Sequence, residues 1–390
     1  MAKRSGAKSG SKTVLWIIVA LIVLVALLVA LAFTPVGDKI IEVIEERAST
    51  SSDYGDTTGG STSGGDTSGG NAFSSLGSPI TSPDGATLLD EVVFEAHFID
   101  VGQGDAILLL FNDGTSVMID AGSGTTAYSN TQGYQNEMVA YVGEVLGDLS
   151  LDYLIITHPD TDHYNMADGV LEAFDVANIY YNDCDKDTRS YIDFKAESAA
   201  EAGANVVRID SDGETYTLFD AESYSVTIYA PGYDRFNPTG GTDYGGEVSN
   251  GMSPIIIVET ASRTLLFTGD ATTETEEWFM DTYAGELDVD FIKIGHHGST
   301  SSTSEAFLDL VTPEYCVIMC DDGEAYGHPA ATVMNRLFDR GIVTYRTNRH
   351  GNITLFIDSD GDMAFNVENH VPVENNTVPG RSDLMLQPAA

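Results

Sequence analysis

The segment Thr157-His158-Pro159-Asp160-Thr161-Asp162-His163 places four potential metal ligands within six residues. It follows the apolar run Leu154-Ile155-Ile156, whose β-branched residues predict a buried strand. A strand end fixes the backbone, so the following turn can direct imidazole and carboxylate groups, donors suited to zinc or manganese, toward one point. The alternative is a helix beginning near His163 and capped by Asp160 and Asp162. Capping explains one aspartate, but not two aspartates between two histidines.

Two later segments repeat this pattern of an apolar strand followed by ligand-type residues. Leu265-Leu266-Phe267-Thr268-Gly269-Asp270 ends in an aspartate, and Phe291-Ile292-Lys293-Ile294-Gly295-His296-His297 ends in a histidine pair. Three predicted strands therefore each end in possible ligands, in the order His/Asp cluster, Asp, His. This order favours a dinuclear metal site built from several strand ends.

The order of motifs resembles the metallo-β-lactamase superfamily. Further motifs at residues 98–106 (FIDVGQGDA), 118–122 (MIDAG) and 326–329 (YGHP) resemble the hydrolase domain of ComEC-type competence proteins and their free-standing relatives. The resemblance covers about residues 92–368. It implies an α/β (α+β) fold, the four-layer αββα sandwich, and a metal-dependent hydrolase.

The resemblance also implies a ligand set for two divalent ions, zinc or manganese. His158 and Asp160 would serve the first ion, and Asp162 and His163 the second. Asp270 would bridge the two ions. Either His296 or His297 would complete the second site, and we favour His296 because it is nearer the strand end.

Three more residues are candidates for contact with substrate or ion. Asn250 stands where a further histidine ligand is common, as a weaker donor to the first ion or a substrate contact. His328 would protonate the leaving group or hold a phosphate oxygen, with a structural loop histidine as the alternative. Lys293 would neutralise charge near the site or contact substrate, although strand alternation makes a surface position equally plausible.

Other residues in the family-like motifs receive no catalytic role. We assign Asp100, Asp105 and Asp120 to the stabilisation of turns. His97 is expected on the polar side of an alternating strand. Asp162 and His328 are therefore the two residues to which we assign catalysis directly.

The rest of the chain reads as appendages to one large domain. Residues 1–13 are a basic cytoplasmic segment, and residues 14–33 are an uncharged apolar run long enough to span a bilayer. A cleaved signal peptide is the alternative to a retained anchor, and both place the later residues outside the cytoplasmic membrane. Residues 34–87 are a juxtamembrane stub and flexible Gly/Ser/Thr/Asp linker, residues 88–368 the hydrolase domain, and residues 369–390 a loose tail.

Alternating periodicities within residues 88–368 predict strands interleaved with helices, which suits two sheets packed face to face with helices outside. Predicted helices cover residues 137–146, 167–174, 189–202, 274–283, 304–310 and 332–340. Predicted strands cover residues 92–99, 106–111, 117–120, 178–181, 205–209, 225–229 and 255–259, with others near 289, 315 and 343.

The chain is strongly acidic, with 60 Asp and Glu against 18 Lys and Arg and a net charge of −42. Such a field repels polyanions, so nucleic acid is possible as a partner but disfavoured. We therefore expect a membrane-anchored, extracytoplasmic metal-dependent hydrolase that cleaves phosphodiesters, without an obligate protein partner. The alternatives are an esterase of cell-wall or surface phosphodiesters such as phosphorylcholine, or a degenerate non-catalytic module.

Overall fold

The computed structural model describes residues 74–371, apart from short gaps, together with residues 385–386. The gaps are residues 82–86, 125–127, 148–149, 183–187, 210–213, 222, 233–235, 237–245, 284–286 and 323–325. The predicted basic segment 1–13, membrane helix 14–33 and linker residues 34–73 lie outside the described residues. Among the helices of the described part, none has both the length and the apolar character needed to cross a membrane.

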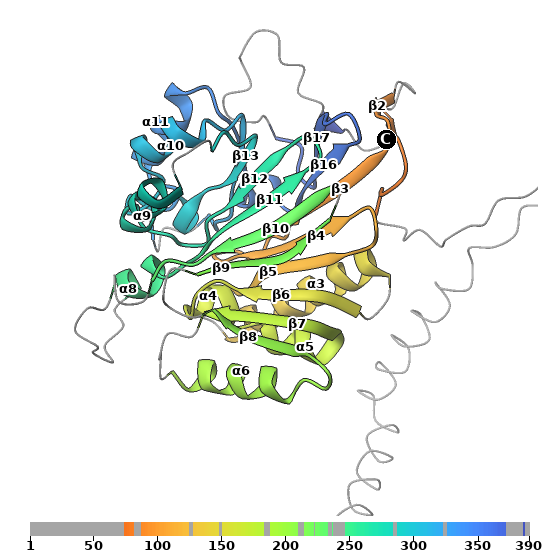
Figure 1. Cartoon of the computed structure of the whole chain (residues 1–390), viewed down its shortest axis with the longest axis vertical. Coiled ribbons are helices and arrows are strands. Elements are labelled where there is room, and N and C mark those ends of the chain that lie inside the picture. Colours follow the sequence, from red (N-terminus) through yellow and green to blue (C-terminus); the bar gives the residue numbers. More distant parts are fainter. Residues whose placement is uncertain are drawn as a thin grey trace, which may run out of the picture. The chain divides into compact units, whose positions relative to one another are not determined.

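Two large sheets stack face to face, and a small hairpin-like pair accompanies them (Figure 1). The nine-stranded sheet has the order β18 (Met385–Leu386), β17 (Met363–Val367), β16 (Ile353–Asp358), β3 (Val92–Phe98), β4 (Ala106–Phe111), β5 (Ser116–Ala121), β6 (Ser150–Ile156), β7 (Asp175–Asn182) and β8 (Asn205–Ile209). The seven-stranded sheet has the order β15 (Val343–Arg346), β14 (Tyr315–Ile318), β13 (Phe291–Lys293), β12 (Thr264–Phe267), β11 (Ile255–Thr260), β10 (Tyr224–Tyr229) and β9 (Thr215–Asp220). The small sheet pairs β1 (Ile80–Thr81) with β2 (Thr87–Leu89).

Helices cover the outer faces of both sheets, which gives the expected order of layers (Figure 1). The nine-stranded sheet packs against α3 (Tyr128–Leu146), α5 (Ala167–Ala173) and α6 (Arg189–Ala200) through one buried apolar cluster. The seven-stranded sheet packs in the same way against α9 (Thr273–Tyr283), α10 (Glu305–Val311) and α11 (Ala331–Asp339). Short helical turns complete the described elements: α4 (Thr161–Tyr164), α8 (Gly246–Gly251), η1 (Gly295–Gly298) and α12 (Thr347–His350).

The main core lies between the two sheets and is rich in aromatic side chains. Phe98 of the nine-stranded sheet stacks on Phe267 of the other, with ring centroids 6.3 Å apart. The same ring lies 5.3 Å from Phe291. Each of these side chains is fully buried, and aromatic pairs of this kind add to the free energy gained by burial alone. The sheets are therefore held at a fixed separation directly beneath the strand ends that carry the ligands.

Parallel pairing brings those strand ends to one edge of the sandwich. In one sheet β5, β6, β7 and β8 are parallel neighbours, and in the other β12, β13, β14 and β15 are. The carboxyl ends of neighbouring parallel strands lie together, so the residues after β12 and β13 meet. Contact between His163, after β6, and Asp270, after β12, joins the ends of the two sheets. The predicted strand-end ligands are thus neighbours in space.

Two predicted boundaries differ from the structure. Residues 74–81, which we assigned to the linker, already lie on the domain: Leu76 forms a bridge to Val92, and the Ser75 amide donates to Glu95 at 2.5 Å. Part of the predicted loose tail is also ordered, because β18 pairs with β17. Both segments are short and flanked by polar residues, so neither carries the periodic pattern that predicts a strand.

Candidate metal centre

The strand ends open onto a cavity of about 610 Å³. Its wall includes most of the residues that the sequence predicts for the site, namely Asp160, Asp162, Asn250, Asp270, His296, His297 and His328. His158 and His163 lie just beneath this wall and are fully buried. Of the predicted set, only Lys293 does not reach the cavity or its floor of histidines.

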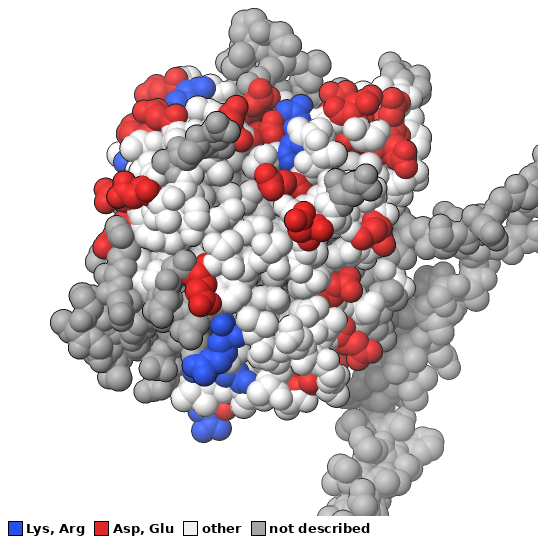
Figure 2. Space-filling model, viewed as in Figure 1, with Lys and Arg blue, Asp and Glu red and all other residues white. Residues whose placement is uncertain are grey.

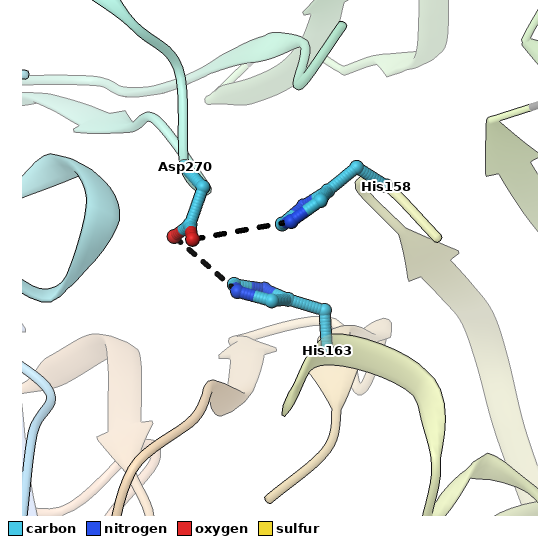
Figure 3. A group of neighbouring side chains, drawn as sticks. All are labelled: His158, His163 and Asp270. Carbon is cyan, nitrogen blue, oxygen red and sulfur yellow. Dashed lines mark ion pairs between the residues drawn. The ribbon is translucent and has the colours of Figure 1, made fainter. Parts of the chain in front are cut away.

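The carboxylate of Asp270 lies at the centre of four imidazole rings. Its Oδ1 atom is 3.3 Å from Nε2 of His163 and 3.6 Å from Nε2 of His297. Its Oδ2 atom is 3.9 Å from Nε2 of His158 and 3.7 Å from Nε2 of His296. Figure 3 shows the rings of His158 and His163 converging on this carboxylate from one side. Each oxygen of Asp270 therefore faces its own pair of histidines.

His158 and His163 are oriented from behind by buried groups. Nδ1–H of His163 donates to Oδ2 of Asp120 at 2.8 Å, which turns Nε2 toward Asp270. Asp120 also accepts from the amide and hydroxyl of Thr157, both at 2.7 Å. The Thr157 hydroxyl lies 3.1 Å from Nδ1 of His158. One buried carboxylate therefore fixes both the strand end and a histidine ring.

The histidine pair lies in the tight turn η1, where both residues have left-handed backbone conformations, with φ of 48° and 53°. Nδ1–H of His297 donates to the carbonyl of Met319 at 2.8 Å, so its Nε2 faces the centre. His296 contacts the Ser301 hydroxyl at 2.8 Å and is partly exposed. Both rings reach Asp270, on opposite oxygens. Both histidines are therefore candidates for ligands, because this turn splays the adjacent rings toward the same carboxylate.

The two aspartates of the opening segment do not cap a helix. Asp160 holds the N-cap position of α4, but its side chain makes no capping hydrogen bond. Instead the Ser249 hydroxyl donates to Asp160 at 2.7 Å, and the other oxygen of Asp160 lies 3.9 Å from His158. Asp162 approaches Nε2 of His297 to 3.3 Å. Both carboxylates thus point into the cavity, which removes the capping alternative.

Buried polar atoms without hydrogen-bond partners show that a cation fits here. Nε2 of His163, Nε2 of His297 and Oδ1 of Asp270 are all inaccessible to solvent and have no such partner. Burying such atoms unpaired costs roughly 1–3 kcal/mol each. Two groups of ligand atoms, His158/His163/Asp270 and Asp162/His163/His297, each lie within 4.8 Å of one another. Nitrogen and oxygen donors in this arrangement suit a divalent ion.

The pKa values of His158 and His163 are shifted in opposite directions. Burial, together with the neighbouring His163, lowers the pKa of His158 to about 4. Burial would also lower the pKa of His163, but the carboxylates of Asp270 and Asp120 outweigh it and raise that pKa well above its ordinary value. Burial opposes ionisation of Asp270, yet the histidines around it hold its pKa well below the ordinary range. The proton on His163 therefore supplies part of the positive charge that stabilises these carboxylates.

Two candidates for substrate contact lie in the cavity wall. Nδ2 of Asn250 is 3.2 Å from Nε2 of His296, which faces Oδ2 of Asp270. This is the side of Asp270 that His158 also faces, where we predicted the first ion. Burial and the neighbouring histidines lower the pKa of His328 to about 4, so its ring is neutral at pH 7. A neutral ring can donate a hydrogen bond to a phosphate oxygen, which is the second of its two predicted roles, and protonation of the leaving group stays a prediction. Nδ1 of His328 lies 3.5 Å from the amide nitrogen of Gln103.

The sequence prediction missed the burial of three groups behind the histidines. Lys293 is fully buried and forms an ion pair with Asp105, so it does not lie on the surface, and its place behind the histidines fits the predicted neutralisation of charge near the site. Asp105 lies 3.5 Å from Nδ1 of His297, and Asp120 bonds to His163, so neither stabilises only a turn. Asp100 does accept from the Gly102 amide at 3.0 Å, as a turn residue would. The pattern of an aspartate after an apolar strand, shared by Asp120 and Asp270, was the available signal.

Comparison with known proteins assigns the chain to a described family. Residues 99–320 match the family described as the Metallo-beta-lactamase superfamily. ComE operon protein 3 of Bacillus subtilis (strain 168) is 27% identical over 272 residues, which cover 66% of this chain and 32% of that protein. Competence protein ComA of Neisseria gonorrhoeae is 38% identical over 115 residues, covering 30% of this chain and 17% of that protein.

The chain therefore spans about a third or less of the length of these curated relatives. Among solved structures, the short form of human tRNase Z aligns with 57% of this chain and 91% of its own length. Its TM-score is 0.35 and its identity 15%, too low to indicate a shared activity.

Proposed function

This chain belongs to the metallo-beta-lactamase superfamily, and we propose that it is a metal-dependent hydrolase that cleaves phosphodiesters. One observation carries the proposal. Four histidines from both sheets surround the two oxygens of Asp270, Asp160 and Asp162 each contact one of these histidines, and buried polar atoms of the cluster have no hydrogen-bond partner. Such a constellation is costly for a protein that binds no cation, so it supports a metal centre.

The proposed ligand set follows the two sides of Asp270. On the Oδ2 side, His158, Asp160 and His296 would hold one ion. On the Oδ1 side, Asp162, His163 and His297 would hold the other, with Asp270 shared between them. His296 would thus be the third ligand of the first ion, a role for which the sequence analysis named only Asn250. Zinc and manganese are the proposed metals, because both accept mixed nitrogen and oxygen ligands.

The chemistry divides between the ions and the side chains. Bound divalent ions activate water for attack and polarise a phosphoryl oxygen. Asp120 and the Met319 carbonyl keep the Nε2 atoms of His163 and His297 turned toward the centre. His328, neutral at pH 7, would donate a hydrogen bond to the leaving-group oxygen or a phosphate oxygen. Asn250 would contact the substrate beside His296.

The proposal also extends to the substrate and the location of the protein. The name of the Neisseria relative refers to competence, and that of a third relative, Recombination protein 2 of Haemophilus influenzae (27% identical over 249 residues), refers to recombination; DNA is a phosphodiester, which favours that bond. The charge of −42 favours a small phosphodiester over a polyanion. Figure 2 shows Asp and Glu spread over one face of the domain, with Lys and Arg in small groups. We place the domain outside the cytoplasmic membrane, anchored through residues 14–33.

A substrate panel on the metal-loaded full chain tests the proposal. The panel contains bis-p-nitrophenyl phosphate, p-nitrophenyl phosphorylcholine, single-stranded DNA and a lactone, each with zinc or manganese. We expect chelator-sensitive turnover of at least one phosphodiester. Turnover of the lactone alone would reject the phosphodiester reaction, and activity that survives chelation would reject the metal mechanism. A chain that binds metal but turns over none of the four would support the non-catalytic module.

A further inference from the structure

We infer that Lys293 is a positioning residue of the metal centre, joining the half that each sheet supplies. This role rests on the proposed function. Lys293 ends β13, a strand with parallel neighbours on both sides, and its side chain is fully buried. An ammonium group in such a place is costly unless it is paired and hydrogen-bonded. An apolar residue would often be as stable there, so the ammonium requires a reason beyond packing.

The ammonium group contacts one partner from each sheet. It forms an ion pair with Oδ2 of Asp105, which precedes β4 of the nine-stranded sheet. It also donates to the carbonyl of Gly269 at 3.1 Å, in the loop after β12 of the seven-stranded sheet. Gly269 immediately precedes Asp270 in the sequence. The carbonyl of Gly269 accepts from the amide of His296 as well, at 3.1 Å.

Asp105 carries this connection to the other ligands. Its Oδ1 atom is 3.5 Å from Nδ1 of His297, and its Oδ2 atom is 3.8 Å from Nδ1 of His163. The amide of Asp105 donates to the carbonyl of Asp162 at 3.0 Å. The Asp105 carboxylate therefore lies directly behind two proposed ligands, and its backbone adjoins a third.

Together these contacts make Lys293 a cross-link between the two halves of the site. The Asp105 side leads to Asp162, His163 and His297, while the Gly269 side leads to Asp270 and His296. The ammonium group of Lys293 therefore fixes the distance between the two halves before a metal ion binds. Without it, the ligands would have to be gathered by the ion itself, at a cost in affinity. Groups that orient ligands in this way typically contribute 10- to 100-fold to metal affinity.

The test compares Lys293→Met with a matched control in the full-length chain. Arg263→Met breaks the ion pair of Arg263 with Asp290, which lies at the opposite ends of the same strands, β12 and β13. Zinc affinity is measured by competition with a chromophoric chelator, and stability by thermal unfolding of the metal-free protein. We expect Lys293→Met to bind zinc about 10- to 100-fold more weakly. Arg263→Met should lose stability while binding zinc as tightly as the unmodified chain.

Equal zinc affinity in Lys293→Met and the unmodified chain would overturn the role of Lys293. If Lys293→Met does not fold, Lys293→Met/Asp105→Asn decides, because it also removes the carboxylate charge left without its partner. We expect this double variant to fold and to bind zinc weakly. Unmodified zinc affinity in it, or its failure to fold, would overturn the inference. An unmodified chain that binds no zinc or manganese would instead reject the proposed function.

Discussion

Nε2 of His163 and Oδ1 of Asp270 lie 3.3 Å apart, although the two residues follow strands of different sheets. Neither atom has a hydrogen-bond partner, and both are inaccessible to solvent. The two groups form an ion pair, and a divalent ion bound to both atoms would take the place of the proton between them. Docking of the two sheets sets this distance, so the packing of the core and the affinity of the site are coupled.

Asp270→Asn should remove the metal centre while keeping the shape of the side chain. An amide cannot supply two anionic oxygens to the histidines on either side, so bound metal should fall below two equivalents. Turnover should fall by more than about 100-fold, the upper range for residues that only orient ligands. Metal content by mass spectrometry of the native protein and initial rates measure both effects. Asp168→Asn, at an exposed position in α5, is the control. An active Asp270→Asn enzyme would contradict the shared ligand.

His296→Ala and His297→Ala should each leave one ion bound. The two rings face different oxygens of Asp270, so each variant should weaken one site and spare the other. The loss at the weakened site should exceed about tenfold in affinity. Titration calorimetry with zinc resolves the two binding events. Two intact sites in either variant would remove that histidine from the ligand set.

Asn250→Ala should leave both ions bound and weaken substrate binding. The side chain lines the cavity, and loss of one hydrogen bond of about 1 kcal/mol predicts a five- to tenfold rise in KM. Steady-state kinetics and metal content are measured on the same preparation. Loss of an ion would show instead that Asn250 is a ligand.

His328→Gln should change the pH dependence of stability in a defined direction. The unfolded ring takes up a proton below about 6.5, but the folded ring does so only near 4, mainly because it is buried. The folded state therefore binds fewer protons in this window, so His328 destabilises the protein increasingly as pH falls through it. The free energy of unfolding of the unmodified chain, minus that of the variant, should rise between pH 4 and 6.5 and stay level above. Denaturant titrations of the metal-free proteins test this, and a level difference throughout would refute it.

Removal of residues 1–67 should leave the stability of the domain unchanged, whereas removal of residues 1–77 should lower it. The longer truncation deletes Leu76 and the Ser75 amide that donates to the fully buried Glu95. A buried acceptor that loses its donor costs roughly 1–3 kcal/mol. Thermal unfolding of the two truncated chains should therefore differ by several degrees. Identical transitions would show that residues 74–77 contribute nothing to the domain.

Features encoded over short distances could be predicted from the sequence. The helices at Ala167–Ala173, Arg189–Ala200 and Ala331–Asp339 lie within two residues of their predicted ends, because apolar periodicity fixes them locally. The ligand segments were also recognisable, since each follows an apolar strand directly. Both signals are properties of a few adjacent residues.

Features that depend on distant partners could not be predicted. Asp120 and His163 meet only in the folded chain, so nothing next to Asp120 indicates its partner. Alternation along strands also misled us for Lys293 and His97. Both belong to inner strands of a sandwich with helices on its outer faces, where inward and outward side chains are alike buried. A polar residue in such a strand indicates a buried partner rather than the surface.

The division of the ligands between the two sheets also orders events during synthesis. The ribosome releases residues 158–163 long before residues 270–297, so a growing chain exposes half of the ligands without their counterparts. That half lacks Asp270 and the histidine pair, and it can offer an ion only an incomplete shell. With the proposed ligand set, ion capture would therefore be a late event in the life of a nascent chain, and loading with metal would mark the molecules whose synthesis has passed β13.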